Sequence, residues 1–465
     1  MHMTTCASRS ETGATMRLAR PSTRRRPTRR RVHLAAAAST AILSLAVAAV
    51  PAQAAPRPSA PDGASTVSLT ATVSGPSATS RTGGLDRTAL RETLDALHQA
   101  GMYGAYSAVR DGSDRWKGAA GVVDVDTGRP VRADFEHRIG SVTKTFTAVA
   151  VLQQVQRGRI DLDAPIGRYL PELVRGERGR EVTVRMLLNH TSGIGDYILG
   201  ALPELATDPG KALDGARLRH WEPEELVRIG LAAEPAPRRG TFSYSNTNYI
   251  VAGLLLEKVT GQDAEDYITR EVIREAGLRH TYFPDSPRLT GPHARMYESF
   301  YGYIDPPRDY GVYDASLFGT AGAMVSTTQD LNDFFRRLLG GKLLGPEALR
   351  AMKTTVPMAE GSAAGYGLGI YTQPLGGRSY WGHDGIVFGA GTLALSSEDG
   401  RRQLAVGYNL TKYQRFDESG EEIVELPNPI DPAFGNHVVT ALTDTFPSAA
   451  PDDAPSLLSV ERLSR

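Results

Sequence analysis

Strand-like segments stand near both ends of this chain, and helical patterns fill the long region between them. Runs that are alternating or rich in β-branched residues, and that are bounded by glycine or turn residues, are typical of strands. They occur at residues 103–110, 116–124, 366–371, 378–381, 390–396 and 403–410. The most economical arrangement joins both sets in one antiparallel sheet of five or more strands. The sequence therefore predicts an α/β (α+β) fold with a helical block inserted into a sheet domain.

Helices are predicted on either side of the sheet strands and throughout the middle of the chain. Leu90, Leu94 and Leu97 recur at helical spacing after Asp86, a residue suited to an N-cap. Further helices are predicted at residues 142–155, 184–189, 249–259, 328–339 and 436–445. We therefore expect one domain over residues 85–446. Its sheet lobe, flanked by the terminal helices, comes from 85–140 and 360–446, and its all-helical lobe from about 155–350.

The first 54 residues have the organisation of a secretory signal peptide. Arginines at positions 24–26 and 29–31 precede an apolar run over residues 34–50, and Ala52-Gln53-Ala54 is a small-x-small cleavage site. A membrane anchor is the alternative, but the run is short and Pro51 follows it at once. We expect a secreted, extracellular protein of the cell-wall region with no stable membrane anchor.

The segments next to the domain have the composition of flexible chain. Residues 55–84 are rich in Pro, Ser, Thr, Ala and Gly and predict a disordered linker, and residues 447–465 predict a flexible tail. Export by the Sec or the twin-arginine route, and a start at Met1 or Met16, are both left open.

The charge balance excludes some classes of partner. The chain has 52 basic and 52 acidic residues, but residues 1–54 hold nine arginines and one glutamate, so the remainder is acidic. An acidic protein is a poor match for nucleic acid or anionic lipid. The single cysteine, Cys6, lies in the predicted signal, and six of the histidines are scattered without ligand spacing. We therefore expect no disulfide, no metal and no cofactor.

The run Ser141-Val142-Thr143-Lys144 is the first motif that suggests chemistry. At a helix start, residues i and i+3 share a face, so the hydroxyl and the amine can meet, and the backbone N–H groups there favour an oxyanion. The chain has 45 arginines and only seven lysines. A desolvated lysine can act as a base, whereas an arginine cannot. A surface lysine beside a helix-capping serine is the structural alternative.

Two further motifs contain groups suited to proton transfer and substrate binding. In Tyr244-Ser245-Asn246, a phenol beside an ammonium can lose its proton and shuttle it, and the Asn246 amide can hold a substrate amide. Trp381-Gly382-His383-Asp384-Gly385 stands between two predicted strands, where glycine allows a ligand close to the backbone. Taken singly, these motifs equally fit a loop tyrosine and a hairpin turn.

The order of the three motifs resembles that of the penicillin-recognising serine enzymes. S-x-x-K is followed 103 residues later by Y-x-N and, after 139 more, by H-x-G. The strings LLNHTSG and YSNTN strengthen the resemblance, which extends over residues 86–446. It is strongest to the exocellular serine D-alanyl-D-alanine carboxypeptidases and the class C β-lactamases, and it implies the β-lactamase/transpeptidase-like fold.

The resemblance also implies a role for each motif residue. Ser141 would be the acylated nucleophile, Lys144 its activating amine and Tyr244 a proton shuttle. Asn246, Asp384 and Gly385 would contact substrate, and His383 stands where relatives often have a catalytic lysine. The backbone N–H groups of Ser141 and Ile386 would form the oxyanion hole. No metal is implied, and we expect His190 in LLNHTSG to support a loop rather than to take part in chemistry.

Several pocket positions depart from the family pattern. Asp384 and Ile386 replace two hydroxyl residues, and Leu317 stands about where the carboxypeptidase has a tryptophan. Residues 371–373 lack its carboxylate-binding arginine, which Arg378 is a candidate to replace.

The predicted activity is therefore that of a serine hydrolase acting through an acyl-enzyme. A D-alanyl-D-alanine carboxypeptidase-type peptidase acting on peptidoglycan peptides is the first interpretation. An esterase or β-lactamase-like hydrolase of uncharged esters or amides is the alternative, and a catalytically idle penicillin- or peptidoglycan-binding protein is an alternative of another class. We expect a small peptide, β-lactam or ester as substrate and a monomeric protein.

Overall fold

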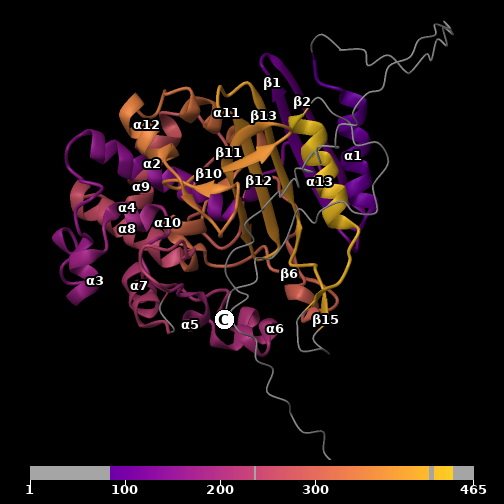
Figure 1. Ribbon diagram of the computed structural model, residues 1–465. Coiled ribbons are helices and arrows are strands. Elements are labelled where there is room, and N and C mark those ends of the chain that lie inside the picture. The colour runs from indigo at the N-terminus through magenta and orange to yellow at the C-terminus, as the bar shows by residue number, and fades with distance from the viewer. Residues whose placement is uncertain (1–83, 235–236, 418–423, 444–465) are drawn as a thin grey trace, which may run out of the picture. The chain divides into compact units, whose positions relative to one another are not determined.

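A nine-stranded antiparallel sheet forms the centre of the structure, which is a computed structural model that describes residues 84–234, 237–417 and 424–443 (Figure 1). The strand order is β3-β2-β1-β13-β12-β11-β10-β9-β8. The strands are β1 (Gly104–Asp111), β2 (Asp114–Asp124), β3 (Arg129–Pro130), β8 (Val356–Pro357), β9 (Gly365–Tyr366), β10 (Tyr371–Leu375), β11 (Arg378–Val387), β12 (Ala390–Ser397) and β13 (Arg402–Tyr408). The predicted signal peptide, the linker up to residue 83 and the tail lie outside the described residues.

Pairing of β1 with β13 joins the two ends of the chain in this sheet. The N-terminal hairpin β1–β2 supplies one side, and β1 pairs with β13 so that Ala108 lies opposite Ala405. The prediction of one antiparallel sheet built from both ends is confirmed. Short strands form three smaller sheets: β4 (His137–Arg138) with β7 (Val325–Ser326), β5 (Tyr297–Glu298) with β6 (Arg308–Asp309) and β14 (Leu410–Thr411), and β15 (Phe416–Asp417) with β16 (Val424–Glu425).

Helices lie on both faces of the large sheet and in a separate region beside it (Figure 1). The N-terminal helix begins after Asp86, whose carboxylate accepts from the N–H groups of Thr88 and Ala89, as its cap position predicted. The helices are α1 (Arg87–Gln99), α2 (Thr143–Gln156), α3 (Gly176–Glu181), α4 (Val184–Leu188), α5 (Ile198–Ala201), α6 (Pro209–Ala216), α7 (Pro223–Ala232), α8 (Asn246–Thr260), α9 (Ala264–Ile268), α10 (Gly319–Gly322), α11 (Thr328–Leu339), α12 (Pro346–Lys353) and α13 (Ile430–Leu442). None of the described helices is long and apolar enough to cross a membrane.

The terminal helices α1 and α13 pack together on one face of the sheet, as expected, and α11 packs on strands β1, β12 and β13. The predicted residue range of the helical lobe, about 155–350, is too long, because α11 packs on the sheet. Its apolar side, which includes Leu331, Phe334 and Leu338, is buried. The helical region proper therefore extends from α3 to α10.

Three predicted boundaries are wrong for identifiable reasons. The strand predicted at 366–371 is two short strands, because Gly369 adopts a φ of +74° and its carbonyl accepts from Thr145 of α2 at 2.7 Å. The strand predicted at 378–381 continues to Val387. The last helix begins at Ile430, because a proline, Pro432, is tolerated in a first helical turn.

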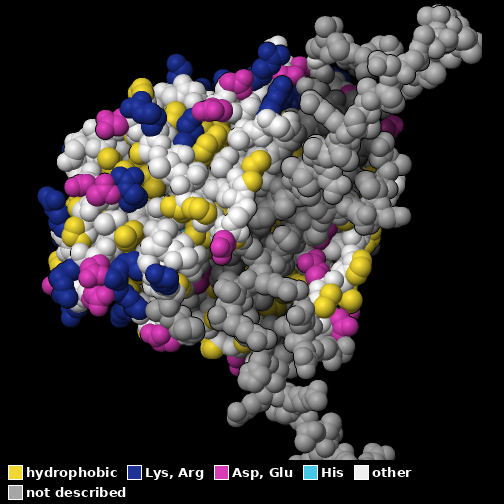
Figure 2. All heavy atoms as spheres, in the orientation of Figure 1, with side chains coloured by type: hydrophobic (Ala, Val, Ile, Leu, Met, Phe, Trp, Pro, Cys, Tyr) yellow, Lys and Arg dark blue, Asp and Glu magenta, His cyan; other side chains and the backbone are white. Residues whose placement is uncertain are grey.

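Charged side chains of both signs are interspersed over the helical region on the face in Figure 2. Several are paired, as in Arg175 with Glu172 at 2.6 Å and Arg239 with Glu177 at 3.2 Å around α3. Neither sign dominates that part of the surface.

Candidate active site

Ser141 lies in a short 3₁₀ turn, η1 (Gly140–Val142), that leads directly into α2. Its residue is partly exposed, whereas the three residues after it are buried. Gly140 turns the chain with a φ of +52°, a conformation that favours glycine. The serine therefore stands at the start of a buried helix, as the spacing of the motif predicted.

The amine of Lys144 lies beside the Ser141 hydroxyl and inside a set of three oxygens. Its Nζ is 3.0 Å from Ser141 Oγ, 2.7 Å from Asn246 Oδ1 and 2.8 Å from the carbonyl oxygen of Ala321. The side chain is fully buried. Burial lowers the pKa of Lys144 to about 7, although the nearby carboxylates of Asp196 and Asp384 act in the opposite direction.

These contacts orient the lysine lone pair when the amine is neutral. Amide and carbonyl oxygens can only accept, so the two hydrogens of a neutral amine point to Asn246 and Ala321. The lone pair then faces Ser141 Oγ and accepts its proton. This is the geometry that a general base requires, and it excludes the interpretation of Lys144 as a surface residue.

Tyr244 faces the same serine. Its phenol is hydrogen-bonded to Ser141, and Lys144 Nζ lies 4.9 Å from the centre of its ring. Burial raises the pKa of Tyr244 well above its usual value, and the Ser141 hydrogen bond only partly opposes this. The sequence predicted that this phenol can lose its proton beside an ammonium, and its raised pKa instead favours the protonated phenol in the resting site. The phenol keeps its proton and is placed to donate it.

Asp196, which the sequence motifs did not indicate, holds Asn246 in place. Asp196 Oδ2 accepts from the Asn246 backbone N–H at 2.8 Å and from Asn246 Nδ2 at 2.7 Å. This orientation of the amide turns Asn246 Oδ1 toward Lys144. Burial raises the pKa of Asp196. Its only signal in the sequence is a position three residues after Gly193 of the LLNHTSG string.

The third motif lies inside β11, rather than between two strands as predicted. Pairing of β11 with β10 ends at Gly382. Beyond this residue, the side of β11 that faced β10 is open, and β11 contacts η1. A Cβ on Gly385 would lie 2.7 Å from the Ser141 nitrogen, and one on Gly140 would lie 2.8 Å from the Ile386 nitrogen. The two glycines therefore bring the predicted oxyanion-hole nitrogens of Ser141 and Ile386 to the same place.

His383 is a buried, neutral residue that contacts its own strand and Tyr366. Its Nδ1 lies 2.5 Å from the Asp384 carbonyl oxygen, so this nitrogen carries the hydrogen, and Nε2 accepts from the Tyr366 hydroxyl at 2.8 Å. Burial lowers the pKa of His383 to about 3. It therefore supplies no positive charge at the position where relatives often have lysine.

Asp384 is the second carboxyl group near the lysine. It is buried, and this burial raises its pKa to about 7, against the attraction of Lys144 and the hydroxyl of Tyr371. Asp384 directly precedes Gly385, which lies against the Ser141 backbone nitrogen, and its carboxyl group acts on the pKa of Lys144. Asp196 and Asp384 are therefore two buried carboxyl groups near the Ser141–Lys144 pair whose charged forms are disfavoured by burial.

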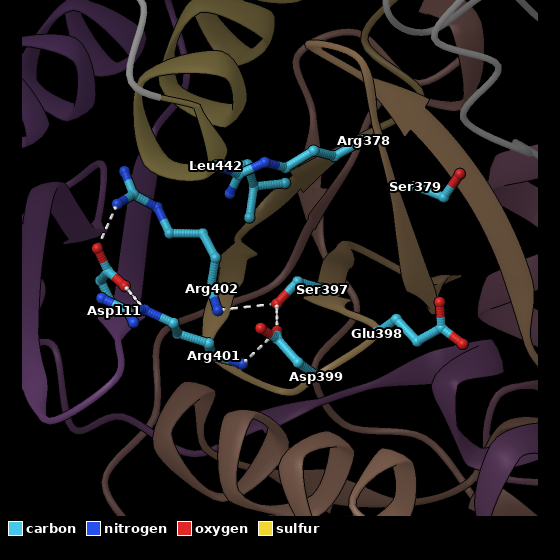
Figure 3. A pocket seen from close by; sticks show the side chains of 9 residues that line it. All are labelled: Asp111, Arg378, Ser379, Ser397, Glu398, Asp399, Arg401, Arg402 and Leu442. Carbon is cyan, nitrogen blue, oxygen red and sulfur yellow. Dashed lines mark hydrogen bonds and ion pairs between the residues drawn. The ribbon is translucent and has the colours of Figure 1, made fainter.

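Arg378 does not supply the missing cation. It begins β11, at the opposite end of that strand from residues 383–386, and its side chain lines a separate surface pocket of about 700 Å³ with Arg401, Arg402 and Leu442 (Figure 3). Leu317 is buried, and its carbonyl accepts from the Tyr197 hydroxyl. The described residues contain no group of three or more His, Cys, Asp or Glu able to hold a metal.

Comparisons with known proteins place this arrangement in context. A family model described as β-lactamase matches residues 88–448. A D-stereospecific amidohydrolase from a Streptomyces species is 38% identical, with 70% of this chain and 95% of that chain covered and a TM-score of 0.65. A D-amino acid amidase from Ochrobactrum anthropi SV3 is 26% identical over 70% and 91% of the two chains, with a TM-score of 0.60.

A relative by sequence adds a third activity. Esterase EstB from Burkholderia gladioli is 37% identical over 211 residues, which are 43% of this chain and 53% of the esterase. The chain spans only about half the length of that esterase.

Proposed function

The chain belongs to the β-lactamase family of serine hydrolases, and from this premise we propose that it cleaves amides, and more readily esters, of D-amino acids that have a free α-ammonium group. The observation that carries the proposal is the pair Asp196 and Asp384, two buried carboxyl groups near the nucleophile. Burial raises the pKa of both, and Lys144 is the cation that partly opposes this rise. The peptidoglycan carboxypeptidase role is the second candidate.

Acylation follows from the hydrogen bonds around Ser141. Ser141 Oγ attacks the substrate carbonyl while its proton passes to the Lys144 lone pair, 3.0 Å away. The N–H groups of Ser141 and Ile386 stabilise the oxyanion. Tyr244 gives its proton to the leaving nitrogen as the C–N bond breaks, and the Lys144 proton restores the phenol. Water then attacks the acyl carbonyl and gives its proton to the same groups. The bond to Ser141 Oγ breaks, Ser141 recovers its proton, and the acid is released.

Charge around the site supports an ammonium rather than a carboxylate in the substrate. Burial raises the pKa of both Asp196 and Asp384, so a cation placed between them would be stabilised and would keep them ionised. A substrate carboxylate would instead meet like charge, at a cost of roughly 4 kcal/mol for a few ångströms at an effective dielectric of 20. Relatives named as an amidohydrolase and a D-amino acid amidase support the same substrate class.

One observation favours the carboxypeptidase candidate under acidic conditions. The pKa of Asp384 is about 7, so below that pH the group is protonated and can donate a hydrogen bond to a carboxylate. Peptidase activity on D-alanyl-D-alanine ends would then increase as the pH falls below 7, opposite to the behaviour expected from Lys144 alone.

A substrate panel separates these candidates. We would measure kcat/KM for D-phenylalanine amide, its N-acetyl derivative, D-phenylalanine methyl ester and an acyl-D-alanyl-D-alanine peptide, with intact mass to detect the acyl-enzyme. The free ammonium should be preferred by more than about tenfold, which needs only about 1.4 kcal/mol of ionic contact. Equal rates for the free and acetylated amides would refute the ammonium preference.

Asp384→Thr is the variant that tests the charge argument. It should increase turnover of the D-alanyl-D-alanine peptide relative to D-phenylalanine amide, because it removes negative charge and restores a hydroxyl. Asp399→Asn, at the remote pocket in Figure 3, is the matched control and should leave the ratio unchanged. An unchanged ratio in Asp384→Thr would mean that Asp384 does not face substrate.

Secretion, a cell-wall location and a monomeric state belong to the same proposal. The signal-like leader over residues 1–54 supports export. Small peptidoglycan-derived amides, esters or peptides are the partners expected there.

A further inference from the structure

His190 lies directly behind Tyr244 and holds the backbone on both sides of it. Its carbonyl oxygen accepts from the N–H of Ser243 at 2.8 Å, and its Nδ1 accepts from the N–H of Ser245 at 3.2 Å. These are the residues immediately before and after Tyr244. One residue therefore fixes the position of the tyrosine backbone through two hydrogen bonds.

The imidazole of His190 also fixes the tyrosine ring. The two rings stack with their centres 4.1 Å apart and their planes at 28°. A third contact, between His190 Nδ1 and Asn248 Nδ2 at 3.2 Å, anchors the imidazole to α8. The ring of Tyr244 therefore stacks on a buried imidazole, while Lys144 Nζ lies 4.9 Å from the centre of the same ring.

The backbone and charge of His190 suit this place. Its φ is +59°, in the left-handed region, where histidine, asparagine and aspartate are the residues other than glycine most often found. Since an N–H donates to Nδ1, the ring carries its hydrogen on Nε2 and is neutral. Burial, together with Lys144 and His383, lowers the pKa of His190 well below its usual value, so the ring adds no charge beside Lys144.

We infer that His190 is a positioning residue of the reaction, which aligns the Tyr244 phenol with Ser141 and with the leaving group. The inference rests on the proposed function, in which Tyr244 donates the proton that an amide leaving group needs. A displacement of about 1 Å in a catalytic group can reduce the rate about 100-fold. Loss of the imidazole should therefore slow reactions that need this proton and spare those that do not.

Two substitutions separate the ring from the acceptor. His190→Asn accepts the left-handed backbone and keeps a side-chain oxygen for the Ser245 N–H, but it has no ring to stack. His190→Phe keeps the ring and removes the acceptor. His437→Asn is the matched control. His437 lies on α13, away from the three motifs, is equally buried, and bonds Thr93 and Ser107 at 2.9 Å.

The readout compares an amide with an activated ester. His190→Asn should reduce kcat for D-phenylalanine amide by about 10- to 100-fold, as expected for impaired proton transfer. It should change acylation by a p-nitrophenyl ester less than about threefold, because that leaving group needs no proton. In a Tyr244→Phe background, His190→Asn should have little further effect, since the two residues act as a unit. His437→Asn should lower stability without separating the two rates.

Several results would overturn the inference. Equal losses on amide and ester, or losses that add to those of Tyr244→Phe, would make His190 a structural residue only. A crystal structure of His190→Asn tests the role independently of turnover: the phenol should move away from Ser141 Oγ, and an unmoved Tyr244 would reject the role. A wild-type enzyme that cleaves no amide would refute the proposed function separately.

Discussion

Replacing Lys144 by arginine tests the base that the structure places beside Ser141. Arginine keeps a positive charge but has no accessible neutral form, so the lone pair that faces Ser141 Oγ is lost. General-base help is typically worth about 10²–10⁴-fold, and Lys144→Arg should lose at least about 100-fold in kcat and in the rate of fluorophosphonate labelling at Ser141. A guanidinium also has five N–H donors, whereas Lys144 Nζ contacts three oxygens.

The unpaired donors predict a loss of stability as well. At least two buried N–H groups would lack partners, at about 1–3 kcal/mol each, so the free energy of unfolding should decrease by roughly 2–6 kcal/mol. Lys353→Arg is the matched control. Lys353, on α12, pairs with the exposed Glu398 at 2.6 Å and lies 5.7 Å from the centre of the Trp381 ring rather than beside Ser141, so it should tolerate the change. Thermal unfolding and labelling measured on both variants separate a folding defect from a chemical one.

The pH dependence gives the same base a second test. The pKa of Lys144 is about 7 and the amine is active when neutral, so labelling of the wild type should increase with pH and be about tenfold slower at pH 6 than at pH 8. Between pH 7 and 10.5 the unfolded chain binds a proton at this lysine that the folded one does not. This group therefore makes folding more favourable as the pH rises through that window. A flat labelling profile, or a Lys144→Arg variant above a tenth of wild-type rate, would refute the assignment.

Three further predictions concern the proton donor, the first residue of β13 and export. Tyr244→Phe should lose at least about 100-fold in amide turnover with an unchanged unfolding midpoint; equal turnover would remove Tyr244 from the mechanism. Arg402→Met should lower the free energy of unfolding by about 1.5–3 kcal/mol, because its buried guanidinium bonds Asp111 at 3.1 Å (Figure 3) and the carbonyl oxygens of Ala441 at 2.7 Å and Thr443 at 3.1 Å. The exposed Arg401→Met should cost less than about 1 kcal/mol in chemical denaturation, and similar values for both would contradict this account. N-terminal sequencing of culture supernatant should find a start near Ala55; a chain retaining residues 34–50 in the membrane fraction would mean an anchor instead.

Features that depend on neighbours in the sequence could be predicted. The leucines of α1 and the cap at Asp86 are local, and so is the i, i+3 spacing that brings Lys144 Nζ to Ser141 Oγ. The break in the strand at Gly369 could not be predicted, because it depends on a hydrogen bond from Thr145 of α2, more than 200 residues earlier in the chain. Hydrophobic periodicity and secondary-structure propensity contain no information about contacts between residues so far apart in the sequence.

The same limit explains which site residues were missed. Asp196 acts by bonding Asn246, 50 residues away, and its own surroundings in the sequence contain no spacing that indicates a contact. His190 lies in a string that marks the family, yet its contact with Tyr244 depends on how α4 meets the start of α8. Motif order therefore predicted the candidate reacting groups, which the structure brings together, whereas the contacts that orient them became visible only in three dimensions.

The charges around Ser141 are the basis for the proposed preference for a cationic substrate. Lys144 has a pKa of about 7 and His383 one of about 3, so at pH 8 the amine is mostly neutral and the imidazole entirely so. Asp196 and Asp384 then have little positive charge beside them. Burial therefore raises the pKa of both groups with little opposition. A substrate ammonium would lower those pKa values and release protons on binding. Proton uptake or release measured on adding D-phenylalanine amide at pH 7 should therefore show a net release that is smaller in Asp384→Thr, and no change with the N-acetyl derivative. Equal proton exchange with both ligands would mean that the carboxyl groups do not sense the ammonium, and the charge argument for the substrate would be wrong.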